Sequence, residues 1–500
     1  MPEHVIAIDQ GTTSTRAIVF DSVAAPVGSA QVELSQHFPQ PGWVEHDPIE
    51  IAEAAVSVAK QAIERAGIAP DDIAAIGIAN QRETTIVWDR STGRPVANAI
   101  VWQDRRTAEI CRELSKTDQA RNIQQITGLV VDPYFSATKL MWLLSVIPDG
   151  QVRAEAGELC FGTVDSWLLW HLTNGEVHAT DATNASRTML LNLHDLQWDP
   201  EMLDLFNIPE AMLPEVRGTA DDFGVTDKSV FGAEIPITAM AGDQHAALYG
   251  QACFKNGQIK CTYGTGAFVL LNKGATVPLQ HSDDNETGLL ATLGFRMGSR
   301  KTYAIEGSVF VTGATVQWLR DGLGVISNGP QTIDMAMAVD SNEGVYFVPA
   351  FVGLGAPHWQ PDATGSITGL TRGSDKNHIV RAALESTAYQ VKDVVDAMEA
   401  GRSRSIQSIR ADGGQSDNPF VMQFQADMLD RPVEVARVTE TTALGAAFLA
   451  GRGVGLWKSD AEIESMWKAS AIYEPSMRES ERNSLYSGWL EALRRTLPRI

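Results

Sequence analysis

Long apolar runs and cysteines are both scarce in this sequence. No apolar run approaches the ~20 residues that a helix needs to cross a bilayer, and we see no basic and apolar segments of a signal peptide at the start. There are four cysteines in 500 residues, Cys111, Cys160, Cys253 and Cys261, and their spacing fits neither a zinc site nor a CxxC redox motif. We therefore expect no membrane insertion and no disulfide framework, and a cytoplasmic location.

Positive charge is also in short supply. Lysine and arginine number 40 against 62 aspartates and glutamates, which leaves a formal net charge of -22. A surface of this sign repels nucleic acid and anionic lipid, so neither is expected as a partner. Any polyanionic ligand must be held locally, by backbone amides, a few cationic side chains and a metal ion.

The sequence lacks the Gly-x-x-x-x-Gly-Lys-Ser/Thr motif, which argues against a P-loop fold. Its length is too great for a single core and suggests two or three domains. A polar segment rich in glycine and proline around residues 215–240 is followed by a strand at 235–241, which ends at residues 242–245, and by a short helix expected at 246–250. We predict domains at 1–250 and 251–500.

A hairpin with a turn of small donors opens the chain at residues 5–20. Gly11 lets the backbone approach a ligand closely, and the following hydroxyls and amides can converge on a phosphate. Asp9 ends the first strand, where a carboxylate could hold Mg²⁺ directly or through water. An ordinary hairpin with an Asx-type turn is the alternative. The donors of the turn are Thr12, Thr13 and Ser14.

The same device returns at residues 259–271, as strand, Gly-Thr-Gly turn and strand. Two such hairpins, one at the head of each half, indicate an internally duplicated protein with a nucleotide between the halves. A third segment, residues 409–420, enters a Gly-Gly turn where an adenine could lie on bare backbone, although the segment taken alone favours a plain strand–turn–helix link. The helical spacing at 49–66 and the buried strand at 73–79 add a βαβ rhythm, which favours an α/β architecture.

Taken together, these segments resemble a known superfamily. Residues 9–13, 263–266 and 411–414 are similar to the two phosphate loops and the adenosine loop of the actin/Hsp70/sugar-kinase superfamily. Residues 134–143 and 365–385 resemble the two signatures of the FGGY carbohydrate kinases, with a departure at Ser145-Val146. The resemblance implies an α/β fold of two duplicated actin-like (ribonuclease H-like) ATPase domains, with the active-site cleft between them, and ATP and Mg²⁺ as cofactors.

Four further segments are similar to those of family members that phosphorylate glycerol: residues 80–85, 101–106, 241–245 and 306–319. This implies a phosphotransferase of glycerol catabolism that converts ATP and glycerol to ADP and sn-glycerol 3-phosphate. We also expect a homo-oligomer, either a dimer or a tetramer. Another FGGY kinase, for a pentulose or gluconate, and an actin- or Hsp70-like ATPase without an acceptor are the alternatives.

The resemblance also assigns residues. It makes Asp243 the base that accepts the proton of the attacking hydroxyl, although its position would equally suit a helix N-cap. The expected glycerol-binding residues are Arg82, Glu83, Trp102, Tyr134, Asp243, Gln244 and Phe268. The expected nucleotide-binding residues are Thr12, Thr13, Ser14, Arg16, Thr265, Gly313, Gln317, Gly414 and Asn418, with Asp9 as the metal ligand. Taken singly, Trp102 and Phe268 would be core residues, Arg82 and Glu83 a surface ion pair, and Arg16 a solvated or ion-paired strand residue.

One loop bears on regulation. Some bacterial members of the family are inhibited by fructose 1,6-bisphosphate through a loop rich in glycine and cations ahead of the base. The matching residues here, 226–236, contain one lysine and two acidic residues, Asp227 and Glu234. Carboxylates repel a bisphosphate, so we predict weak or no sensitivity to it.

Overall fold

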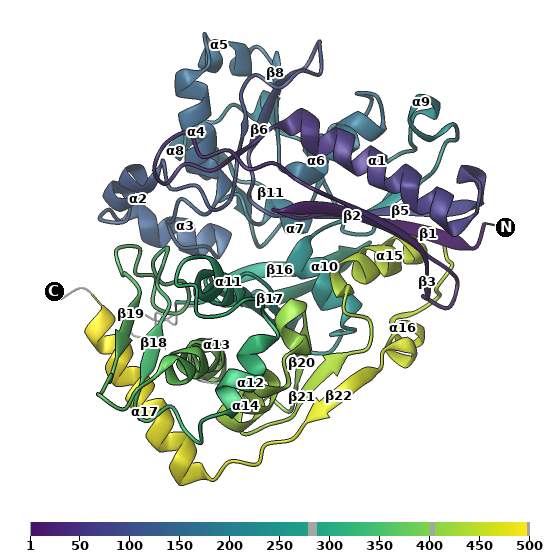
Figure 1. Ribbon diagram of the computed structural model, residues 1–500. Helices are drawn as coiled ribbons and strands as arrows, with labels where there is room; N and C mark the ends of the chain where they lie inside the picture. The colour runs from purple at the N-terminus through teal and green to yellow at the C-terminus, as the bar shows by residue number, and fades with distance from the viewer. Residues whose placement is uncertain (1, 279–287, 401–405, 498–500) are drawn as a thin grey trace.

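The computed structural model describes residues 2–278, 288–400 and 406–497. Figure 1 shows the purple-to-teal first part of the chain above the green-to-yellow second part, each built around its own sheet. In the first sheet, the hairpin strands and their neighbour are antiparallel and two further strands run parallel to the first strand. Its order is β13 (Ile237–Gly242), β5 (Ile73–Asn80), β1 (His4–Gln10), β2 (Ser14–Phe20) and β3 (Pro26–Glu33).

The second sheet repeats that pattern. The second hairpin and the strand beside it are antiparallel, and two strands follow in parallel on the other side of its first strand. One more strand is added at each edge. The order is β16 (Leu290–Met297), β17 (Arg300–Val309), β15 (Ala267–Gly274), β14 (Ile259–Tyr263), β20 (Ile409–Asp412), β21 (Val433–Ala436) and β22 (Ala469–Tyr473). The internal duplication predicted from the two hairpins is therefore confirmed.

The remaining elements cover or connect the sheets. In the first half these are β4 (Glu45–His46), α1 (Pro48–Ala66), η1 (Pro70–Asp72), β6 (Ile86–Asp89), β7 (Ala99–Ile100), α2 (Ala108–Leu114), α3 (Gln119–Thr127), α4 (Ser136–Val146), α5 (Gly150–Glu155), β8 (Leu159–Gly162), α6 (Val164–Leu172), β9 (Ala179–Asp181), α7 (Ala182–Ala185), β10 (Leu191–Asn192), β11 (Gln197–Trp198), α8 (Pro200–Leu205), η2 (Glu210–Met212), β12 (Glu215–Arg217), α9 (Lys228–Phe231) and α10 (Asp243–Gly250). In the second half they are α11 (Gly313–Asp321), α12 (Gln331–Met337), β18 (Tyr346–Val348), β19 (Ser366–Thr368), α13 (Lys376–Glu399), η3 (Gly414–Asp417), α14 (Pro419–Leu429), α15 (Thr441–Gly453), α16 (Asp460–Met466) and α17 (Glu479–Thr496). Within the described ranges, no helix has the length and apolar character needed to span a membrane.

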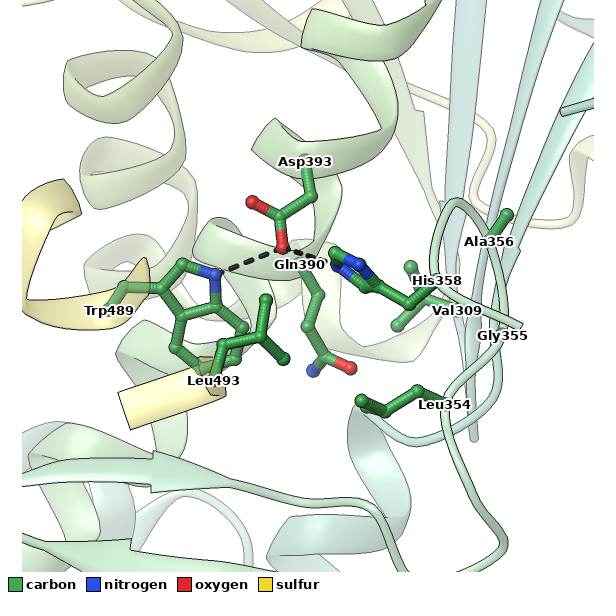
Figure 2. Close-up of a pocket in the computed structure, with 9 residues that line it drawn as sticks. All are labelled: Val309, Leu354, Gly355, Ala356, His358, Gln390, Asp393, Trp489 and Leu493. Atoms are coloured by element: carbon green, nitrogen blue, oxygen red, sulfur yellow. Dashed lines mark hydrogen bonds and ion pairs between the residues drawn. The ribbon is translucent and has the colours of Figure 1, made fainter. Parts of the chain in front are cut away.

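A buried carboxylate attaches the C-terminal helix to the second half. Asp393 of α13 accepts hydrogen bonds from Tyr486 Oη at 2.7 Å and Trp489 Nε1 at 3.0 Å, both on α17. His358 Nε2 lies 3.2 Å from Oδ2, the oxygen that also accepts from Trp489, beside a small cavity (Figure 2). Because each oxygen has a protein partner, we assign this cluster a structural role.

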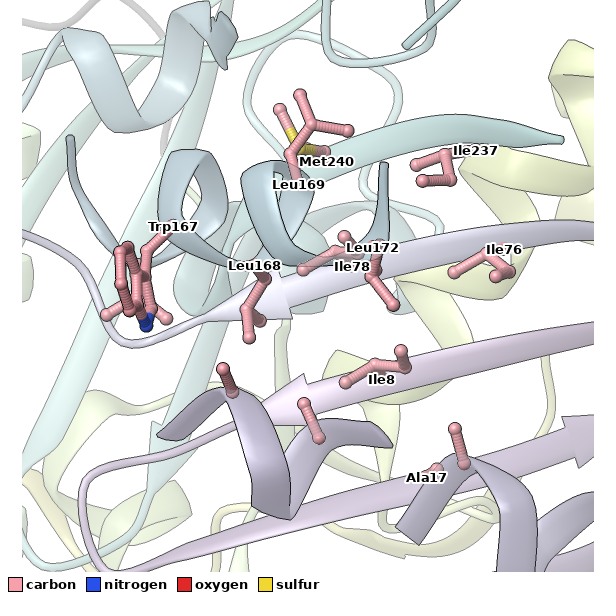
Figure 3. Close-up of a cluster of buried hydrophobic side chains, with 14 of the residues drawn as sticks. Ile8, Ala17, Ile76, Ile78, Trp167, Leu168, Leu169, Leu172, Ile237 and Met240 are labelled. Carbon is pink, nitrogen blue, oxygen red and sulfur yellow. The ribbon is translucent and has the colours of Figure 1, made fainter. Parts of the chain in front are cut away.

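The core of the first half follows from its strands and helices. Ile8, Ile76 and Ile78 are buried in neighbouring strands and face Leu168 and Leu172 of α6 (Figure 3). Helix α1 covers the sheet beside them. Its N-terminus is capped by the Asp47 carboxylate, Pro48 occupies the first turn, and Gly67 ends it with φ 70°. These are common signals for starting and ending a helix, and the helix predicted at 49–66 is confirmed.

Two short helices connect the halves by crossing between them. Helix α10 follows the last strand of the first sheet and contacts β14, β15 and β16 of the second. Helix α15 follows β21 of the second sheet and packs on β1, β5 and β13 of the first. The crossing is so close that a Cβ on Gly445 would lie 1.8 Å from the Ala246 carbonyl oxygen. This packing fixes the position of α10 relative to both sheets.

The start of α10 corrects one expectation. The sequence suggested that the chain leaves the strand at residues 242–245 and enters a helix only at Ala246. Instead, Gly242 is the N-cap and Asp243 is the first helical residue. The polar run from 243 to 245 has no apolar periodicity to mark a helix, but all three residues belong to its first turn.

Candidate active site

The turn of the first hairpin joins the end of β1 to the start of β2. The turn is closed by the Gly11 amide, which donates to the Ser14 carbonyl oxygen at 2.9 Å. Thr13 is exposed at its tip. Thr12 Oγ1 accepts a hydrogen bond from Trp102 Nε1 at 2.8 Å. The predicted phosphate loop and the predicted glycerol-site wall are therefore in direct contact.

Arg16 lies on β2, directly across the hairpin from Asp9 of β1. It donates to Gln31 Oε1 and pairs with Glu440, a residue of the second half. Gln31 in turn donates to Ser14 Oγ at 3.0 Å. In this arrangement Arg16 is ion-paired, as in the alternative considered for it, and its contact with phosphate stays a prediction.

The second hairpin supports the start of α11. The carbonyl oxygens of Gly264 and Thr265 accept hydrogen bonds from the amides of Thr312, Gly313 and Ala314, at 2.9–3.1 Å. A Cβ on Gly313 would lie 2.5 Å from the Gly264 oxygen, so this close packing requires glycine. Thr265 and Gln317 are both exposed, on the turn and on the helix respectively.

The Gly-Gly turn lies next to that hairpin. A Cβ on Gly413, whose φ is 85°, would meet the Tyr263 carbonyl oxygen at 2.7 Å, whereas a Cβ on the exposed Gly414 would have no heavy atom within 4 Å. Asn418 Oδ1 accepts from the amides of Phe420 and Val421 and caps α14. The turn thus leaves bare backbone at Gly414, and the Asn418 side chain caps a helix.

Arg82 is at the centre of the predicted glycerol residues. Its Nε lies 3.2 Å from Asp243 Oδ1, and its Nη2 lies 3.4 Å from the Tyr134 hydroxyl. Its guanidinium is 5.8 Å from the centroid of the Phe268 ring. Trp102 completes the group, with its ring centroid 5.7 Å from Tyr134 and 6.3 Å from Phe268. The structure brings these five residues together from both halves of the chain.

Two residues that the sequence analysis missed hold Arg82 in place. Glu306, on β17, accepts from Arg82 Nη1 at 2.5 Å and Nη2 at 2.9 Å, and from Arg187 Nη2 at 3.2 Å. All three side chains are buried. Although burial acts to raise it, the guanidinium groups of Arg187 and Arg82 hold the pKa of the Glu306 carboxyl well below its usual range. The cluster is thus a buried ion network, not a surface pair.

Glu83 closes this network from the other side. Its carboxylate accepts from Arg187 Nε at 2.7 Å, and its φ of 61° is unusual for a residue with a side chain. The Thr84 amide donates to the Arg82 carbonyl oxygen at 2.7 Å, which makes a tight turn around it. Strained backbone of this kind is retained where the surroundings impose it, and it concentrates at functional sites. Burial raises the pKa of Glu83.

Asp243 projects from the first turn of α10. Its Oδ1 accepts from the backbone N–H of Gln244 at 2.7 Å, and its Oδ2 lies 3.2 Å from the side-chain Nε2 of the same residue. The side chain is 28% exposed, in contrast to the buried Arg82 beside it. A Cβ on Gly242 would lie 2.6 Å from Arg82 Cδ, so the absence of a side chain at Gly242 leaves room for the Arg82 side chain. Asp243 is therefore a reachable carboxylate, and the N-cap role falls to Gly242.

Two family models match almost the whole chain. The N-terminal domain of the FGGY family of carbohydrate kinases matches residues 4–250, and its C-terminal domain matches residues 259–454. The chain belongs to the FGGY family of carbohydrate kinases. It is an ATP-dependent carbohydrate kinase with the two-domain α/β fold of that family, as the sequence resemblance predicted. The boundary at residues 250 and 251 stays a prediction.

Relatives of this FGGY kinase are similar along their full length. It is 55% identical to glycerol kinase 2 of Thermotoga maritima over 495 residues, with 99% of each chain covered. It is 51% identical to glycerol kinase of Deinococcus radiodurans over 498 residues, with 99% of this chain and 98% of that one covered. The crystal structure of Plasmodium falciparum glycerol kinase with ADP matches with a TM-score of 0.90 at 37% identity, covering 99% of both chains.

Asp9 is the predicted metal ligand of this FGGY kinase. Burial, together with the negative charges of Asp243 and Glu440, raises the pKa of Asp9 to about 7, against the opposing effect of Arg16. In the described part of the chain no three metal-ligating side chains cluster. Mg²⁺ does not need such a cluster, since it is held by one or two carboxylates with phosphate oxygens and water. A crowded carboxylate beside a phosphate loop fits that requirement.

Proposed function

We propose that this FGGY kinase is a glycerol kinase, which transfers the γ-phosphate of ATP to glycerol and yields sn-glycerol 3-phosphate and ADP in glycerol catabolism. The observation that carries the proposal is the Arg82 cluster. It brings polar groups of Arg82, Tyr134 and Asp243 together with the rings of Trp102 and Phe268, beside the first phosphate hairpin. The relatives named glycerol kinase, at 51–55% identity, support the same assignment.

The cluster suits a small polyol. Glycerol has three hydroxyls along one short apolar edge, so its site needs several hydrogen-bonding groups and an aromatic wall. The hydrogen bond from Trp102 to Thr12 holds that wall close to the phosphates. Buried polar groups that bind each hydroxyl also reject analogues that lack one, because the groups would be left unpaired. A longer sugar would need a roomier pocket than these rings allow.

Each group has a role in the transfer. Asp243 accepts the proton of the attacking hydroxyl, while Arg82, fixed by Glu306, orients the acceptor. The hydroxyls and amides of Thr12, Thr13, Ser14 and Thr265 bind the β- and γ-phosphates, and Gly313, Gln317, Gly414 and Asn418 line the nucleoside. Mg²⁺, held by Asp9 directly or through water, would neutralise the charge that builds up on the phosphates.

A homo-oligomer in the cytoplasm completes the proposal. The cysteines are all free and buried, which suits a reducing compartment. Light scattering of the pure protein measures the assembly and separates the expected dimer or tetramer from a monomer.

A panel of acceptors tests the assignment. The pure protein with ATP and Mg²⁺ is given glycerol, xylulose, ribulose or gluconate, and ADP release is followed. We expect glycerol to stimulate ADP release far above the other acceptors. A preference for a pentulose or gluconate would assign another FGGY activity, and equal ADP release without any acceptor would indicate an ATPase.

A further inference from the structure

The second half of the chain places a buried lysine behind the proposed catalytic base. Lys260 lies on β14, and its side chain is fully buried. Its Nζ donates to Gln244 Oε1 at 2.5 Å and to Thr262 Oγ1 at 2.8 Å. No ion pair within 4.0 Å involves Lys260 among the residues that the structure describes. A buried ammonium group is costly, so its position next to Gln244 requires an explanation.

The contact determines which way the Gln244 amide points. An ammonium group has three donors and no acceptor, so only the amide oxygen can face it. The amide nitrogen must then point the other way, where Nε2 lies 3.2 Å from Asp243 Oδ2. Reversing the amide would place its oxygen against the Asp243 carboxylate and its donors against the ammonium group. Both neighbours therefore favour the same orientation.

The base is thereby given a donor on each oxygen. Asp243 Oδ1 accepts from the backbone N–H of Gln244 and lies beside Arg82 Nε, and Oδ2 accepts from the side-chain Nε2 of Gln244. Of these donors, Arg82 Nε is held in place by Glu306 of β17, and Gln244 Nε2 is held in place by Lys260 of β14. Two adjacent segments of the first half are thus each fixed by one charged residue of the second sheet.

We propose that Lys260 is a positioning residue, which fixes the Gln244 amide so that its donors face the Asp243 carboxylate and the acceptor hydroxyl. This inference rests on the proposed role of Asp243. Lys260 acts through Gln244 and touches neither the acceptor nor ATP. Among the charged side chains around Lys260, the carboxylates of Asp412 on β20 and of Asp243 favour its ammonium form, and the Arg82 guanidinium disfavours it. Burial lowers the pKa of Lys260, and the two carboxylates counter that effect.

A double-mutant cycle tests the inference. Lys260→Met keeps most of the length of the side chain and removes the charge and the donors, and Gln244→Met removes the side-chain amide. We expect K260M to lower kcat about tenfold or more and to raise KM for the acceptor, with KM for ATP unchanged. The double variant should be no worse than Q244M alone, because Lys260 acts only through that amide. Losses that multiply, or wild-type kinetics in K260M, would overturn the proposal.

Two further variants make the result decisive. Lys260→Gln keeps a donor toward Gln244 without the charge and should recover part of the loss. It is the variant to measure if K260M does not fold. An unchanged KM for the acceptor in K260Q would contradict the proposal. Lys255→Met removes an exposed lysine paired with Glu464 and should behave as wild type. All rates are measured with the acceptor that the wild-type enzyme phosphorylates, so a failure of glycerol in the panel is distinguishable from a failure of the Lys260 proposal.

Discussion

The surroundings of Asp243 are the strongest structural support for its proposed role as the general base. It is the partly exposed member of a group whose other polar residues, Arg82, Glu83 and Glu306, are buried and mutually paired. Buried pairs of this kind need not stabilise the fold more than apolar residues would. We interpret them as the rigid support that holds donors around one reachable carboxylate, which is what a general base requires.

The substitution Asp243→Asn tests that interpretation. The asparagine side chain has the same shape as aspartate and keeps an oxygen for Arg82, so acceptor binding should persist. Turnover should fall by about 10²–10⁴-fold, the usual contribution of general-base catalysis. Acceptor binding is measured by calorimetry and turnover by ADP release. Near-normal turnover would mean that Asp243 only orients its neighbours.

Asp9 gives a prediction about pH. Its pKa of about 7 in the folded protein exceeds the ordinary 3.8, so the folded state disfavours its ionised form. The stability that this group contributes is therefore present at low pH and is lost as pH rises from about 4 to about 7. Relative to D9N, the wild-type protein without Mg²⁺ should lose free energy of unfolding over that range.

Urea unfolding of both proteins near pH 5 and near pH 8 makes the comparison. Asp71→Asn, at an exposed position, is the control and should show no such change. A difference between wild type and D9N that is the same at both pH values would contradict the argument.

At this scale, the sequence predicted residues that lie in contiguous polar motifs. Arg82, Asp243 and Gln244 fall in such segments, and the structure brings them together. Arg187 and Lys260 were missed as site residues because each is a single charge with no local pattern, and Glu306, although it begins the segment 306–319, was assigned no role. Their partners lie 16 to 224 positions away in the chain, so only the folded arrangement reveals why they are charged.

Among the elements, the turns after β1, β14 and β20 matter most. Each contains glycine, but the three turns use it differently. After β1, Gly11 forms a tight turn, and after β14 a Cβ on Gly266 would lie 2.4 Å from the Val309 carbonyl oxygen. After β20, Gly413 adopts a positive φ against Tyr263 and Gly414 stays uncovered. The predicted adenine position depends on that last feature.

Gly414→Val separates binding from folding. A Cβ there meets nothing within 4 Å, and the position does not need a positive φ, so stability should be close to that of wild type. If an adenine lies on this backbone, the added side chain will displace it. We expect KM for ATP to rise about tenfold or more, with KM for the acceptor unchanged, in steady-state kinetics.

The matched control is Gly373→Val. Gly373 is also exposed, and its Cβ would meet only Thr371 Oγ1, at 3.7 Å. It should leave both KM values unchanged. An unchanged KM for ATP in G414V would place the adenine elsewhere.

Hairpins and long helices were predictable at this scale because local signals define them: alternation, glycine turns, and the cap residues around α1. The start of α10 was missed by three residues because its first turn is polar. Its helical state is imposed by the packing against α15, where Gly250 and Gly445 let the backbones meet. That contact joins residues almost 200 positions apart, and no local pattern marks it.

For the whole molecule, the duplication is the main organising feature. The paired hairpins predicted two similar sheets, and both sheets have the expected pattern. The exchange of α10 and α15 between the sheets was not predictable, since it depends on tertiary packing. Through it, residues of both halves meet at Arg82 and Asp243.

Regulation is also a property of the whole molecule. The loop ahead of the base forms α9, where Asp227 caps the helix and Lys228 lies 3.4 Å from Glu234. The only cation of the loop is therefore already paired, and the remaining charges repel a bisphosphate. We expect a titration of fructose 1,6-bisphosphate to leave the initial rate nearly unchanged. Strong inhibition at sub-millimolar concentration would show that this enzyme binds the effector by other residues.

The geometry of this site supports phosphoryl transfer to glycerol above any other reaction. The most direct test measures ADP and sn-glycerol 3-phosphate in one reaction of the pure protein with ATP, Mg²⁺ and glycerol. We expect equal amounts of both products at every time point, and almost no ADP when glycerol is omitted. ADP formed without an equal amount of sn-glycerol 3-phosphate, or at the same rate without glycerol, would contradict this assignment.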